Sequence, residues 1–138
     1  MNFKQLERFV DSQEVSFLGS IDEDGFPNMK AMLKPKGRTG LKEFYFSTNT
    51  SSLRVQQYLK NSKATVYFYQ KGLIKYQGLM LIGNMSVITD PEVKKEFWAV
   101  GDQMYYRQGV TDPDYCILKF TAIKGRYYCN LKTESFEV

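Results

Sequence analysis

Six consecutive polar residues at positions 47–52 form the segment of this chain best suited to bind a ligand. They follow an aromatic run at 44–46, typical of a strand, and they precede a stretch with helical spacing that begins at Leu53. The free N–H groups and the positive dipole end of a helix N-terminus attract anions. Hydroxyl and amide groups beside Arg54 are therefore those expected around a phosphate. The alternative interpretation is an ordinary N-cap, where Ser, Thr and Asn are favoured.

The chain contains no histidine, which excludes several kinds of catalytic and metal site. Ser-His-Asp and Cys-His catalysis, histidine metal ligation and imidazole acid–base chemistry are all ruled out. Cys116 and Cys129 fall in separate predicted strands, and two cysteines without histidine cannot close a structural zinc site. We expect reduced thiols and no bound metal. Any chemistry then depends on carboxylates, Lys, Tyr or a bound cofactor.

Positive charge is concentrated in the middle of the chain. Residues 26–75 contain ten basic side chains and one acidic side chain, a net charge of +9. Because the whole chain carries +4, the remainder carries −5. A basic middle indicates an anionic partner, whether a nucleotide, a phosphorylated small molecule or nucleic acid.

The hydrophobic periodicity places these groups in a mainly β chain. Aromatic residues make up 15% of the sequence, which favours a β-rich core. Helices are expected at 2–12, at 51–60, from Thr89 onward and at 102–107, and strands at 15–21, 27–34, 43–47, 64–69, 73–89, 115–121 and 124–131, with a tail at 133–138. With no internal repeat and no linker, the pattern predicts a single domain over residues 1–138. Its expected class is α+β, mainly β, most simply an antiparallel barrel.

The sequence has no run of 18 apolar residues, and its first residues lack the apolar core of a signal peptide. We therefore expect a soluble, cytoplasmic protein with no membrane partner.

Several segments occur in an order that is informative in itself. FLGSIDEDGFPNMKAM at 17–32 combines a D-G-x-P turn with a strand bearing a basic residue, and FYFSTN at 44–49 joins an aromatic strand to a Thr-Asn turn. The helical segment 51–62, the strand 64–68 and GNMSVITDPE at 83–92 follow. In this order the chain resembles the pyridoxamine 5′-phosphate oxidase-like family of FMN-binding split barrels, particularly its general-stress-protein branch. The likeness spans residues 3–130.

The resemblance implies a split barrel with short flanking helices, usually a homodimer with two FMN sites at the subunit interface. The flavin phosphate would meet Lys30, Ser51, Ser52 and Arg54. The residues implied beside the ribityl chain and ring are Met29, Lys30, Ala31, Met32, Ser47, Thr48 and Asn49. Gln77 is an approximate match to a family glutamine. The candidates for contacts from the second subunit are Trp98, Tyr127 and Tyr128.

The resemblance implies an FMN-binding, flavin-dependent oxidoreductase or stress-response protein that uses a small-molecule electron donor or acceptor. True pyridoxamine phosphate oxidases carry a basic, histidine-bearing motif near the C-terminus, which residues 125–138 lack, so vitamin salvage is not expected. No catalytic residue is assigned. The alternatives are a single-stranded nucleic-acid-binding barrel with tyrosines as a stacking platform, a barrel binding deazaflavin or haem, and a cofactor-free dimeric barrel. The first is disfavoured because the chain has no RNA-binding motif.

Overall fold

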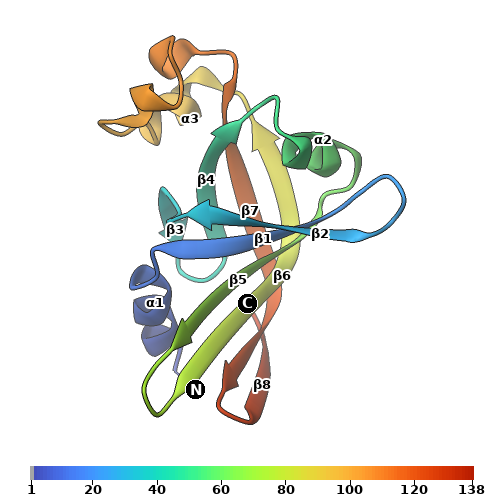
Figure 1. Ribbon diagram of the computed structural model, residues 1–138, viewed down its shortest axis with the longest axis vertical. Helices are drawn as coiled ribbons and strands as arrows, with labels where there is room; N and C mark the ends of the chain where they lie inside the picture. The colour runs from blue at the N-terminus through green and yellow to red at the C-terminus, as the bar shows by residue number, and fades with distance from the viewer. Residues whose placement is uncertain (1) are drawn as a thin grey trace.

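Eight strands form one antiparallel sheet in the computed structural model, which describes residues 2–138. The hydrogen-bonded order is β2-β1-β5-β6-β7-β4-β3, and β8 pairs with β7. Figure 1 shows the sheet curling into a split barrel with the helices around it, which confirms the predicted fold class. The strands are β1 (Val15–Ile21), β2 (Pro27–Leu33), β3 (Gly37–Thr39), β4 (Glu43–Asn49), β5 (Lys63–Lys71), β6 (Tyr76–Ile88), β7 (Tyr115–Cys129) and β8 (Lys132–Glu137).

The helices are short and lie at the margins of the sheet (Figure 1). The helix α1 (Phe3–Asp11) is amphipathic and buries Leu6, Phe9 and Val10. The helix α3 (Pro91–Glu96) has its N-cap one residue later than expected, because Asp90 rather than Thr89 accepts the first-turn N–H of Glu92 at 2.8 Å. The remaining helices are α2 (Leu53–Lys60) and the 3₁₀ turns η1 (Asp102–Met104) and η2 (Gly109–Thr111).

Alternation along the strands separates a packed interior from an outer surface. In β4, Phe44, Phe46 and Thr48 are buried, while the residues between them are partly exposed. The main core continues through Leu18, Val66 and their neighbours on β5–β7. A second cluster of buried residues under α3 consists of Tyr106, Tyr115 and Ile117. The aromatic content of the sequence therefore supplies the core of the barrel.

The C-terminal strands differ from the expectation. Residues 115–129 form one strand, β7, rather than two, and the predicted tail contains β8. The first half of β7 pairs with β4 and the second half with β8. A register shift at Ile82/Gly83 lets β6 follow this bend, and a Cβ atom at Gly83 would lie 2.0 Å from the carbonyl oxygen of Thr121. Cys116 and Cys129 thus share one strand, and both are free thiols.

Candidate functional site

The polar segment 47–52 lies where β4 ends and α2 begins, as the sequence predicts. Thr48 is the last inward-facing residue of β4, with only 4% of its surface exposed. Ser52 is the N-cap of α2, and its hydroxyl accepts the N–H of Val55 at 3.4 Å. Ser52 also donates its own N–H to the carbonyl of Asn49 at 3.0 Å. Ser52 therefore has the role of an ordinary N-cap, while the rest of the turn has other partners.

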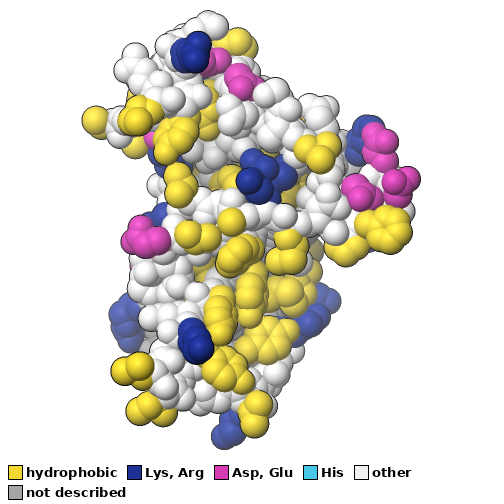
Figure 2. Space-filling model, in the orientation of Figure 1, with side chains coloured by type: hydrophobic (Ala, Val, Ile, Leu, Met, Phe, Trp, Pro, Cys, Tyr) yellow, Lys and Arg dark blue, Asp and Glu magenta, His cyan; other side chains and the backbone are white. Residues whose placement is uncertain are grey.

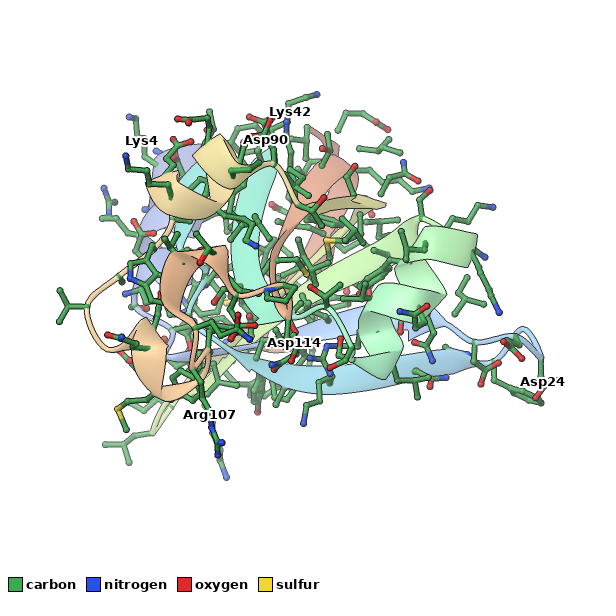
Figure 3. The ribbon with its side chains drawn as sticks, turned by 90° about the horizontal axis from the view of Figure 1, so that it is seen from above. Lys4, Asp24, Lys42, Asp90, Arg107 and Asp114 are labelled. Carbon is green, nitrogen blue, oxygen red and sulfur yellow. The ribbon has the colours of Figure 1, made fainter. Side chains whose placement is uncertain are left out.

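Asp114 lies in the segment just before β7, and it holds the turn 47–52 in place through hydrogen bonds. Its Oδ1 accepts the backbone N–H of Ser51 at 2.8 Å, and its Oδ2 accepts the side-chain amide of Asn49 at 2.8 Å. Its carbonyl accepts the N–H of Thr50, also at 2.8 Å. Hydrogen bonds from the Ser51 side chain and backbone and from Asn49 lower the pKa of the Asp114 carboxyl. Figure 3 shows Asp114 between α2 and the segment that follows α3.

The Asp114 contacts have no clear signal in the sequence. The residue lies 63 positions from Ser51 in a loop whose Asp and Pro residues are typical of any turn. Only the antiparallel pairing of β4 with β7, which aligns Asn49 with Tyr115, brings the two segments together.

Arg54 extends from the first turn of α2 toward the same polar segment. Its Nη2 donates to the Oγ1 of Thr48 at 2.9 Å. Its Nε is buried without a hydrogen-bond partner, and so is the Oγ1 of Thr50. The Thr50 hydroxyl lies beside the Cys116 sulfur and, as a donor to it, opposes the rise in the pKa of that thiol caused by burial, but sulfur is only a weak acceptor. A cationic donor and a hydroxyl left unsatisfied at a helix N-terminus match what an oxyanion such as a phosphate requires.

The strand β2 approaches α2 through a chain of polar contacts. Gln57 of α2 accepts a hydrogen bond from the hydroxyl of Ser20 and donates from Nε2 to Oδ1 of Asn28 at 3.1 Å. Because side chains alternate along a strand, Lys30 lies on the same face of β2 as Asn28. The structure therefore places Lys30 on the face that α2 contacts. Met32 shares this face and packs against the core.

Met29 and Ala31 lie on the opposite face of β2, which belongs to a broad apolar surface. Residues of β2, β1, β5, β6 and β7, most of them with outward side chains, line a groove of about 870 Å³. Met29 at its margin is 69% exposed, and Tyr67, Met80 and Tyr128 form part of its wall. Figure 2 shows hydrophobic side chains running down the middle of the molecule on this side. We call this surface the groove face.

Gln77 is separated from the turn 47–52 within one chain. It lies near the start of β6, where its Oε1 accepts the hydroxyl of Tyr127 at 2.7 Å. At the opposite end of β6, Ile88 pairs with Ile117 of β7. The β7 residue before it, Cys116, pairs with Thr48 of β4. From Gln77 to Ile88 the strand extends for about 35 Å at about 3.3 Å per residue.

Of the three second-subunit candidates, only Tyr128 lies on the groove face. Tyr127 is bonded to Gln77. Trp98 packs its ring edge-on against Tyr115 with a centroid separation of 5.1 Å, in the cluster under α3.

Ion pairs neutralise part of the basic middle of the chain. Lys36 contacts Asp102 at 2.7 Å, Arg38 contacts Glu7 and Asp11, and Lys60 contacts Glu23. These three cations have structural partners, unlike the Nε of Arg54. Within residues 2–138 no group of three or more Asp, Glu, Cys or His side chains could hold a metal ion. None of the helices in that range has the length and apolar character needed to cross a bilayer.

The chain is similar to known proteins over almost its entire length. The family model described as pyridoxamine 5′-phosphate oxidase matches residues 3–129. A crystal structure of a protein from Clostridium acetobutylicum related to general stress protein 26 of Bacillus subtilis, of the pyridoxinephosphate oxidase family, is 38% identical with a TM-score of 0.87. The similarity covers 100% of this chain and 97% of that one. A search of curated proteins gave no match.

More distant structures share the fold. General stress protein 26 from Bacillus anthracis is 16% identical, with a TM-score of 0.78 over 99% of this chain and 98% of that one. A heme binding protein from Mycobacterium smegmatis is 12% identical, with a TM-score of 0.77 over 99% of this chain and 58% of that one. The family match over residues 3–129 and the 38% identical structure show that this chain belongs to the pyridoxamine 5′-phosphate oxidase family.

Proposed function

We propose that residues 1–138 act as one FMN-binding domain and that the protein is a flavin-dependent oxidoreductase. The observation that carries this proposal is the pair of unsatisfied buried groups, Arg54 Nε and Thr50 Oγ1, at the N-terminus of α2. A flavin phosphate would satisfy both groups without displacing the Arg54–Thr48 hydrogen bond. Membership of the family supports FMN over other phosphorylated ligands.

Two groups of residues in this chain would bind different parts of the cofactor. Arg54 with Ser51 and Ser52 would hold the phosphate, and Lys30 would approach it from the α2-facing side of β2. The turn 47–49 and the strand 29–32 would border the ribityl chain and ring. When bound, FMN supplies the electron or hydride transfer. The chain's own part is binding, orientation and electrostatic support.

We also propose that the protein is a homodimer built on the groove face. A contiguous apolar surface of this kind is typical of an interaction site. Its side chains include Tyr67, Met80 and the largely exposed Met29, which a monomer would leave in water. The site would then lie beside the interface, since β2 contributes one face to α2 and the other to the groove.

Pyridoxamine phosphate itself is not the proposed substrate. The chain has no histidine, and its C-terminal strand β8 carries Lys132 as its only basic residue. The proposed partner in turnover is therefore another small electron donor or acceptor. A cytoplasmic location is part of the same proposal.

Titration of the purified protein with FMN tests the central point. We expect quenching of flavin fluorescence and a shifted visible absorption spectrum that saturates at one FMN per chain. Equal affinity for deazaflavin and FMN, or no saturable binding of either, would contradict the proposal. The dimer is tested separately by sedimentation of the protein with and without FMN.

A further inference from the structure

Lys94 on α3 is the one lysine or arginine within residues 2–138 that is buried, with 8% of its surface exposed. Moving an ammonium group out of water is costly unless a counter-ion compensates it. No carboxylate of the described residues forms an ion pair with Lys94. Its neighbour Lys95 is exposed, as lysines on short surface helices usually are. The reason for burying Lys94 must therefore lie in what its ammonium contacts.

The Lys94 side chain contacts the chain where it enters β7. Its Nζ donates to the carbonyl of Asp112 at 3.0 Å and lies 5.3 Å from the centroid of the Tyr115 ring. The Tyr115 hydroxyl in turn donates to the Lys94 carbonyl at 2.7 Å, and the Tyr115 N–H donates to the Asp112 carbonyl at 3.0 Å. Figure 1 shows α3 beside the end of the sheet where β4 ends and β7 begins. Lys94 thus fixes the backbone at residue 112 relative to α3.

Asp112 connects this contact to Asp114. The carboxylate of Asp112 is buried, and its Oδ1 accepts the N–H of Asp114 at 2.9 Å. Asp114 then accepts the N–H of Ser51 at 2.8 Å and so holds the turn 47–52. A continuous series of hydrogen bonds therefore joins the ammonium of Lys94 to that turn through two aspartates. A change in the position of residue 112 would move the group that orients the turn.

Charge alone is a second way in which Lys94 could favour an anion at the turn. Burial raises the pKa of the Cys116 thiol, and the charges of Lys94 and Arg54 oppose that rise, so both cations lie within electrostatic range of the thiol. Lys94, however, covers the ring of Tyr115 in the cluster under α3, whereas Cys116 belongs to the main core on the other face of β7. Arg54 contacts Thr48, which pairs with Cys116. The strand β7 thus separates the two cations, and the hydrogen-bonded path is the more direct one.

We propose that Lys94 is a positioning residue of the phosphate site, which orients Asp114 through Asp112 and thereby sets the N–H groups of the turn 47–52. This inference rests on the proposed function, in which the N-terminus of α2 binds the phosphate of FMN. A lysine that served only the fold could be replaced by an apolar residue of similar shape with little loss. A positioning lysine cannot, because the turn is then less well preorganised for an anion.

Lys94→Met tests this role, because it keeps the apolar stem and removes the ammonium. The measured quantity is the dissociation constant for riboflavin divided by that for FMN, which isolates the contribution of the phosphate. We expect this ratio to fall by about three- to tenfold in Lys94→Met, in line with the net contribution of one hydrogen bond. Lys95→Met is the matched control, since it removes the same charge from the exposed neighbouring residue and should leave the ratio unchanged. Urea denaturation of each variant shows that the proteins compared are folded.

A double-mutant cycle tests the path from Lys94 to the turn. If Lys94 acts through Asp114, adding Lys94→Met to Asp114→Ala should lower the ratio by less than about twofold beyond Asp114→Ala alone. Effects that multiply would overturn the proposal in favour of a direct effect of charge.

A ratio that Lys94→Met leaves unchanged, whether both flavins bind more weakly or neither does, would assign Lys94 to the fold alone and overturn the proposal. If Lys94→Met does not fold, Asp112→Ala removes the next link in the path. It should give the same loss and the same coupling to Asp114→Ala, and an unchanged ratio there would be equally contrary. A wild-type protein with no preference for FMN over riboflavin would overturn the phosphate site together with this inference. An unchanged ratio in the variants beside a clear wild-type preference would overturn the inference alone.

Discussion

Arg54 donates from Nη2 to the hydroxyl of Thr48 at 2.9 Å, while the Nε of the same guanidinium is buried without a partner. One nitrogen of this edge of the guanidinium is therefore held by the protein, while Nε on the same edge has no acceptor among the described residues. Such preorganisation suits an oxyanion, because the donor geometry is set before binding.

Thr48→Val tests this positioning role. The substitution keeps the shape of the side chain but removes the acceptor that orients Arg54. We expect the dissociation constant for FMN to rise by about three- to tenfold, in line with the net contribution of one ordinary hydrogen bond, with little change for riboflavin. Fluorescence titration with both flavins measures the effect. Thr39→Val on β3, an exposed threonine, is the matched control. Equal losses for the two flavins would mean that Thr48 supports only the fold.

Asp114 should act on the same site through the turn that it holds. Asp114→Ala removes the acceptors for Ser51 N–H and Asn49 Nδ2, so FMN affinity should fall by about tenfold. Asp114→Asn should retain most of the affinity, because one amide oxygen still accepts the Ser51 N–H. A result in which Asn is as damaging as Ala would assign the effect to charge rather than to geometry.

The pH dependence of this contribution follows from the lowered pKa of Asp114. A carboxyl whose folded pKa is depressed stabilises the folded state above its unfolded pKa of about 3.9, and this stabilisation is lost as pH falls through the folded value. We therefore expect the wild-type protein to lose stability relative to Asp114→Asn as pH falls below about 4. Urea denaturation of both proteins at pH 3 and pH 6 measures the difference. If the difference in unfolding free energy between the two proteins is the same at pH 3 and at pH 6, this account is refuted.

The sequence predicts most of the fold and the position of the polar turn at 47–52. The alternation at 15–21, the aromatic strand at 44–46 and the helix after it are local patterns, and the structure confirms them. The continuity of β7 could not be predicted, because its bend depends on a register shift in the partner strand β6. Asp114 was missed for a related reason, since its contacts depend on β4–β7 pairing across 63 residues.

The groove face is a second feature that could not be predicted from the sequence. The alternation of β1 and β5 identifies which side chains leave the core, but both faces of these strands carry aromatic or aliphatic residues. Periodicity therefore could not show that the outer side chains form one exposed apolar surface. That surface emerges only when five strands are aligned in register.

The fold itself makes a further prediction at β4. Phe44 is fully buried between Phe68 and Phe120, with ring centroids 5.7 and 6.5 Å away. Phe44→Ala should lower the free energy of unfolding by about 3–5 kcal/mol, because it leaves a cavity in the main core. Phe26→Ala in the β1–β2 hairpin, where the ring is 66% exposed, should change it by less than about 0.5 kcal/mol. Chemical denaturation of both variants measures the contrast, and similar losses would mean that the core is misplaced.

The central claim is that the N-terminus of α2 binds the phosphate of FMN, and the most direct measurement compares FMN with riboflavin, which lacks that phosphate. The ratio of their dissociation constants should favour FMN in the wild-type protein. In Arg54→Ala this ratio should fall by about tenfold to a hundredfold, with a further fall when Lys30→Ala is added, whereas Arg8→Ala on α1 should leave it unchanged. If Arg54→Ala weakens both flavins equally, or neither, the phosphate does not bind at this helix N-terminus.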